Sequence, residues 1–179
     1  VTLPTWAWTQ ERPWDVQWDQ LHPLWWPLFA LAAALVLLIL FGMFSKSATV
    51  PLHTWLPDAG VAPTTVTALL HAAVLVKIGV YAYARLFLYT FKLPGDWLQA
   101  IPVLAVVSSL IAAAAATVET DFKRILAYST VSQIGYIVLA LGAASELAIV
   151  AAAFHFFNHA VSKAQLFANA AAVETQLGT

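Results

Sequence analysis

The chain has 179 residues, of which 61% are hydrophobic and only 9% are charged, and its mean hydropathy is +0.80. Soluble domains carry about 25% charged residues, so this composition excludes an ordinary soluble protein and indicates a membrane protein. The net charge of −1 argues against a nucleic-acid partner. The absence of cysteine excludes disulfides, iron–sulfur ligation and thiolate zinc sites within these residues.

The amino-terminal residues 1–23 are expected to lie along the membrane surface. They mix four tryptophans with charged residues, and indoles favour the membrane–water interface. The segment begins with Val1 and lacks the basic and short apolar regions of a signal peptide. We expect it to belong to a longer protein.

The first predicted span, 24–43, leads into a break. Pro51 and Pro57 stand six residues apart, and an unbroken helix would lose backbone hydrogen bonds at both. The sequence therefore predicts a helix that ends near 46–51 and then resumes. Broken helices at membrane depth are tolerated only inside protein or beside water.

The rest of the chain predicts four more apolar helices and a short carboxy-terminal loop: spans 64–87, 98–118, 125–142 and 146–172, and a loop at 174–179. Ser129, Thr130, Ser132 and Gln133 are expected to bond to neighbouring helices. The predicted fold is all-α, a polytopic transmembrane bundle of about five spans with its core at 24–173 and, once the family resemblance below is included, two broken helices.

Lys77 is the most informative single residue. It is fourteenth in the span 64–87, near the bilayer centre, where a lysine costs about 2.5–3.5 kcal/mol. It is either functional or part of a structural ion pair, and no acid of this sequence is expected at its depth. His71, six residues earlier on another stripe of that helix, is either a proton relay or a hydrogen-bonded core histidine.

His155, His159 and Lys163 share one helical face, since they are spaced i, i+4, i+8 at about 6 Å per step. Three bases on one stripe of an apolar helix suggest a proton ladder. His-x-x-x-His spacing also occurs in zinc sites, but no glutamate follows the first histidine, no third ligand lies locally, and the lysine cation would oppose a metal.

Lys46 stands where the first helix is expected to break. Unwound backbone there offers carbonyls to an ammonium group. The alternative is a lysine at a helix end that reaches the membrane surface.

Several strings resemble the antiporter-like, proton-pumping membrane subunits of complex I, of multi-subunit cation/proton antiporters and of membrane-bound hydrogenases. The resemblance covers about residues 28–173. The strings are PLHTWLPDA at 51–59, ALLHAA at 68–73, DFKRILAYSTVSQIGY at 121–136 and FHFFNHAVSK at 154–163.

This resemblance implies roles for the buried bases in proton translocation. Lys46 would lie on the broken seventh helix of the family's subunits, where it would pair with a glutamate of the fifth. His71 and Lys77 would lie on the eighth helix, and the stripe of His155, His159 and Lys163 on a broken eleventh. The fifth and twelfth helices have no counterpart in the 179 residues, so we expect a fragment of a longer subunit.

The expected function is proton translocation in a complex I-like, redox-driven pump. The alternatives are a subunit of a sodium/proton antiporter and a non-transporting structural subunit. This chain is expected to hold no cofactor and no metal, and to carry out no redox chemistry itself. Expected partners are the lipid bilayer, other membrane subunits and protons, with sodium as an alternative ion. If the chain belongs to a redox-driven pump, redox subunits with flavin and iron–sulfur clusters are expected as well. We expect a prokaryotic inner membrane, with Lys123 and Arg124 on the cytoplasmic side.

Overall fold

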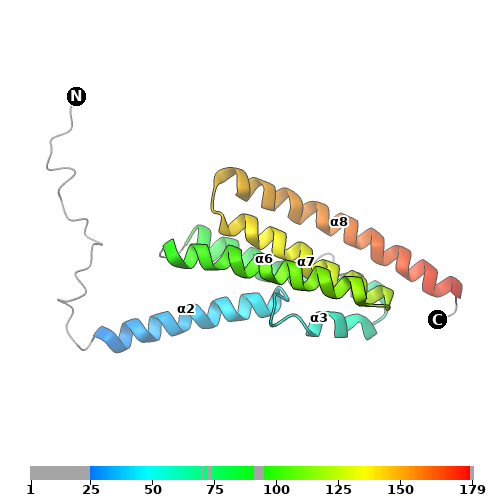
Figure 1. Cartoon of the computed structure of the whole chain (residues 1–179), viewed down its shortest axis with the longest axis horizontal. Coiled ribbons are helices and arrows are strands. Elements are labelled where there is room, and N and C mark those ends of the chain that lie inside the picture. The colour runs from blue at the N-terminus through cyan, green and yellow to red at the C-terminus, as the bar shows by residue number, and fades with distance from the viewer. Residues whose placement is uncertain (1–24, 70, 72–73, 91–94, 178–179) are drawn as a thin grey trace, which may run out of the picture. The chain divides into compact units, whose positions relative to one another are not determined.

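The structure is a computed structural model that describes residues 25–69, 71, 74–90 and 95–177. Every regular element in these residues is helical (Figure 1), in the order α2 (Trp26–Lys46), α3 (Trp55–Asp58), the 3-10 helix η3 (Ala59–Val61), α4 (Thr64–Ala68), α5 (Leu75–Tyr83), the π-helix η5 (Ala84–Leu88), α6 (Gly95–Val118), α7 (Phe122–Gly142) and α8 (Glu146–Leu177). The all-α prediction is confirmed. The expected interfacial segment 1–23 lies outside the described residues.

The chain divides into two compact units, Val1–Leu38 and Ile39–Thr179, and all packing discussed below lies within the second. In the part of the chain that the structure describes, three helices are long and apolar enough to cross a membrane: Trp26–Lys46, Ala100–Val118 and Phe122–Gly142. The predicted span 64–87 is divided among shorter helices, and α8 carries several polar side chains within its apolar length.

The predicted break after the first span is present, because α2 ends at Lys46 and the next α-helix begins at Trp55. Ala48 has a positive φ of 53°. Side chains satisfy carbonyls near the end of α2: the Trp55 indole donates to Ser45 O at 2.9 Å, and the Thr49 hydroxyl donates to Phe44 O at 3.0 Å. Residues 47–49 are buried, so this irregular backbone lies inside protein, as apolar surroundings require.

A second break was not predicted and divides the span 64–87. Helix α4 ends at Ala68 and α5 begins at Leu75. Between them Val74 N–H donates to Leu69 O, five residues earlier, at 3.3 Å, which is the wide turn of a π-helix. Such turns occur frequently at functional sites. Lys77 consequently lies in the first turn of a new helix rather than in the middle of a long one.

Helix α7 is the centre of the second unit and packs against α3, α5, α6 and α8. Its amino terminus is capped by the Asp121 side chain, which accepts hydrogen bonds from the backbone N–H groups of Lys123 and Arg124 at 2.8 and 3.1 Å. Gly135 permits close approach to α6, because a Cβ there would lie 2.8 Å from the Ser109 Cβ.

Helix α8 differs from two expectations. The break that the family resemblance implied near the His155–Lys163 stripe is absent, and α8 runs without interruption from Glu146 to Leu177. It also continues into the predicted terminal loop at 174–179. The physical reason is tertiary contact: Glu174 in the additional turn pairs with Lys123 Nζ at 2.7 Å and accepts a hydrogen bond from Thr64, and both contacts hold that turn against α7 and α4.

Candidate functional site

The three bases of α8 lie on one stripe, as predicted. His159 and Lys163 are buried, and His155 is half-buried. The His155 and His159 rings are 6.4 Å apart, centre to centre. Phe167 continues the stripe one turn beyond Lys163 and is fully buried. One face of α8 therefore presents bases and then an aromatic ring to the interior.

Lys77 of α5 faces α8. Its side chain is only 2% exposed, and its Nζ lies 5.2 Å from the centre of the Phe156 ring. A cation over an aromatic face gains some stabilisation, but less than the hydration it loses on full burial. His159 interacts electrostatically with both Lys77 and Lys163. This histidine is therefore placed to connect the lysine of α5 with that of α8.

Lys163 is held by α7. Its Nζ donates to Leu126 O at 2.8 Å and to the Ser129 hydroxyl at 2.5 Å, and that hydroxyl donates in turn to Leu126 O at 2.9 Å. We call these two acceptors the Lys163 dock. Both are uncharged, so the dock orients the amine without neutralising it. The expectation that Ser129 bonds to a neighbouring helix is confirmed, but the sequence did not identify Lys163 as its partner.

His71 lies between α4 and α5 and is fully buried. Its ring packs against Phe167 of α8, with centres 5.0 Å apart, and it interacts electrostatically with Lys163. The residue that sequence reasoning placed on a separate stripe from Lys77 therefore reaches the same face of α8. Phe156 and Phe167, which contact the two bases, were not predicted as part of the site.

All three of these histidines carry buried ring nitrogens that form no hydrogen bond to the part of the chain that the structure describes: Nδ1 and Nε2 of His71 and of His159, and Nε2 of His155. The hydrogen-bonded core interpretation of His71 is therefore not supported within the described residues. An unsatisfied buried polar group costs about 1–3 kcal/mol. Ionisable groups kept at membrane depth at such a cost are candidates for function.

Lys46 stands apart from these bases. It is the last residue of α2, its side chain is exposed, and in the described ranges it forms no ion pair. The glutamate that the resemblance implied as its partner is not part of the sequence. Within the described residues, no three histidine, cysteine or acidic side chains are grouped to hold a metal ion. The described site is thus a cluster of four buried bases with His155 at its edge.

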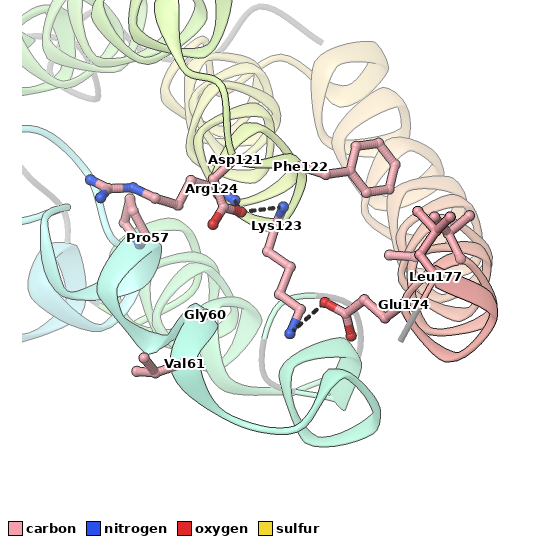
Figure 2. Close-up of a pocket in the computed structure, with 11 residues that line it drawn as sticks. Pro57, Gly60, Val61, Asp121, Phe122, Lys123, Arg124, Glu174 and Leu177 are labelled. Atoms are coloured by element: carbon pink, nitrogen blue, oxygen red, sulfur yellow. Dashed lines mark hydrogen bonds and ion pairs between the residues drawn. The ribbon is translucent and has the colours of Figure 1, made fainter. Parts of the chain in front are cut away.

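A second polar group lies where α4 and α7 begin and α8 ends. Figure 2 shows Lys123 and Glu174 reaching toward each other across a pocket of about 590 Å³. The Lys123 side chain, with the Thr64 hydroxyl as a second donor, holds the pKa of the Glu174 carboxyl below its ordinary value. Arg124 pairs separately with Glu119, Nε to Oε1, at 3.1 Å. Glu174 was not among the predicted site residues, because its contacts come from distant parts of the sequence.

Comparison with known proteins places these features in a family. Residues 21–178 match the family model described as "NADH:quinone oxidoreductase/Mrp antiporter, TM". NADH-quinone oxidoreductase subunit L of Pseudomonas aeruginosa is 48% identical over 150 residues, which cover 84% of this chain and 23% of that protein. An Na(+)/H(+) antiporter subunit of Alkalihalophilus pseudofirmus is 41% identical over 158 residues, which cover 80% of this chain and 20% of that protein.

A solved structure shows the same arrangement of helices. A chain in the structure of the Mrp complex from Dietzia sp. DQ12-45-1b superposes with a TM-score of 0.77 at 38% identity, covering 89% of this chain and 18% of that one. The chain thus spans about a fifth of the length of these similar proteins.

Proposed function

Because the chain belongs to the NADH:quinone oxidoreductase/Mrp antiporter family of transmembrane subunits, we propose that it carries part of a proton path through a membrane. The path would use Lys77, His159, Lys163 and His71, with His155 at its edge. The observation that carries this proposal is that the buried His159 interacts electrostatically with two buried lysines, Lys77 of α5 and Lys163 of α8.

The chemistry follows from the side chains. An imidazole can accept a proton on one ring nitrogen and release one from the other, and its ordinary pKa lies near neutrality. A lysine in a low-dielectric interior holds its proton less firmly than in water, so a change in a neighbouring charge can move that proton. Lys77 adds a second effect, because the first turn of a helix disfavours a cation. A proton leaving Lys77 for His159 would remove the cation from the first turn of α5 and place it, still buried, one turn from Lys163.

Two driving reactions are compatible with this path. Our first choice is a redox-driven pump, in which partner subunits with flavin and iron–sulfur clusters handle the electrons and this chain holds no cofactor. The relatives that are NADH-quinone oxidoreductase subunits support it. The similarity to the Mrp complex, and to part of an Na(+)/H(+) antiporter, supports the second candidate, a sodium/proton antiporter.

The surroundings are part of the proposal. The chain would work beside other membrane subunits, in a prokaryotic inner membrane. Lys123 and Arg124 would face the cytoplasm, where short loops carry an excess of basic residues. Lys46 keeps a proposed role only if a carboxylate outside these 179 residues pairs with it. A purely structural role for the chain would leave the energetic cost of four buried bases without a function.

The test is proton transport in inverted membrane vesicles that contain the full complex, comparing wild type with Lys77→Met. Ile78→Met is a matched control, because the neighbouring Ile78 side chain is exposed. The assay is run once with an electron donor and once with a sodium pulse. A donor-dependent gradient that Lys77→Met abolishes supports the pump, and a sodium-dependent response lost in the same variant supports the antiporter. Undiminished transport by an assembled Lys77→Met complex with both drivers would refute the path.

A further inference from the structure

Figure 2 shows the outer pair of the pocket, Lys123 and Glu174. The lining also includes Ala170 on α8 but none of the four buried bases. A neighbouring pocket of about 470 Å³ is also lined by Lys123 and Glu174, so the ion pair borders both spaces. Polar and charged side chains around spaces of this size admit water.

An apolar layer begins where the pocket ends. Ala170 forms a buried cluster with Phe167 and Leu126, and Ala68 of α4 packs against it. Phe167 and Ala170 are exposed by 0% and 1%, and Leu126 by 5%. The layer therefore contains residues of α4, α7 and α8. The contacts of Glu174 with Lys123 and Thr64 connect the same three helices on the pocket side of the layer.

The buried bases lie directly behind this layer. The Phe167 ring contacts the His71 ring, with centres 5.0 Å apart, and Leu126 supplies the carbonyl of the Lys163 dock. Along α8, Glu174 is seven residues from Phe167, or about 10 Å, and Phe167 is four residues from Lys163, or about 6 Å. The apolar layer that contains Phe167 therefore lies between a polar pocket and two of the buried bases.

We propose that the pocket is an aqueous access site for protons and that Phe167 is the barrier between it and the His71–Lys163 pair. Hydrophobic constrictions of this kind control passage by excluding water. While Phe167 covers His71, no continuous row of water connects the pocket to the bases. When its ring moves aside, water and a proton can pass between the pocket and His71. This inference rests on the proposed proton path for its purpose, but the barrier itself has its own test.

The first test is passive proton leak in vesicles that contain the full-length complex, measured with a pH-sensitive dye after an acid jump, with neither donor nor sodium. Phe167→Ala is expected to increase the leak rate several-fold over wild type. Phe157→Ala is the matched control, because that ring lies on the same helix but is 67% exposed, and it should leave the leak unchanged. If Phe167→Ala prevents assembly, Phe167→Leu takes its place and should give a smaller increase.

The second test uses thiol labelling, since these 179 residues contain no cysteine. Val173→Cys, on the pocket side, is expected to react with a small water-soluble thiol reagent. Ser129→Cys, at the Lys163 dock, should react only when Phe167 is also shortened. Labelling is read at each position by mass spectrometry.

An assembled Phe167 variant with the wild-type leak rate, and with no labelling of Ser129→Cys in the same background, would overturn the barrier and leave the proton path standing. Conversely, a leak in Phe167→Ala together with normal driven transport in Lys77→Met would overturn the path and leave the barrier.

Discussion

Removing the Ser129 hydroxyl tests whether the Lys163 dock matters for transport. Ser129→Ala takes away one of the two acceptors of Lys163 Nζ and leaves Leu126 O. A hydrogen bond to a charged group contributes about 1.5–3 kcal/mol. At about 1.4 kcal/mol per factor of ten, the ratio of docked to undocked ammonium is expected to fall about 10- to 100-fold, and the docked population falls with it.

Transport should fall with that population, because an undocked amine is no longer held beside His71 and His159. Initial rates of driven proton uptake in vesicles are the assay, at equal amounts of assembled complex. Ser129→Thr retains a hydroxyl and should restore most of the rate. Thr130→Val is the control, because the Thr130 hydroxyl also donates to Leu126 O, at 2.9 Å, but does not supply an acceptor of the dock. Equal rates for Ser129→Ala and Thr130→Val would refute the reasoning.

Two further predictions concern the scaffold. Gly135→Ala should lower the stability of the purified protein to thermal unfolding by about 1–3 kcal/mol, because the added Cβ would collide with Ser109. Gly42→Ala is the control: a Cβ added there has no atom within 4 Å, so the stability should stay unchanged or rise. A loss in Gly42→Ala as large as that in Gly135→Ala would contradict the packing. The ion pair of Glu174 and Lys123 should stabilise the protein above the ordinary glutamate pKa and lose this effect as the pH falls through the lowered folded-state pKa. The melting temperature of Glu174→Gln should therefore lie below wild type near neutral pH and converge with it in acid, and a constant difference would contradict the pKa.

Several features could be predicted because they depend on local sequence. The apolar lengths indicated spans, the spacing of His155 and Lys163 put them on one face, and Pro51 and Pro57 marked the first break. Each is a consequence of helix period or backbone chemistry, which a single sequence contains.

The remaining features depend on contacts between distant residues. The break between Ala68 and Leu75 contains neither proline nor glycine, and His71 within it is buried against Phe167 of α8. The Ser129–Lys163 bond joins residues 34 positions apart, and the Thr64–Glu174 bond joins residues 110 apart. Neither register follows from periodicity, which gives the face of a helix but not its partner.

The continuous α8 shows the limit of reasoning from resemblance. The family pattern correctly selected the buried bases of this helix but led us to expect a break beside them. In the structure, hydrogen bonds to α7 at Lys163 and the ion pair of Glu174 with Lys123 hold α8 along its length. Motif identity therefore located the buried bases better than it located the ends of the helices.

The most direct test of the central claim is the effect of His159→Gln on driven proton transport, because in the proposed path His159 connects Lys77 with Lys163. Glutamine keeps a polar side chain in the buried position but cannot carry a proton near neutral pH. The measurement is the initial rate of proton uptake, with donor and with sodium, at matched amounts of assembled complex. Our account predicts loss of transport with whichever driver the wild-type complex uses, and wild-type rates in His159→Gln would contradict it.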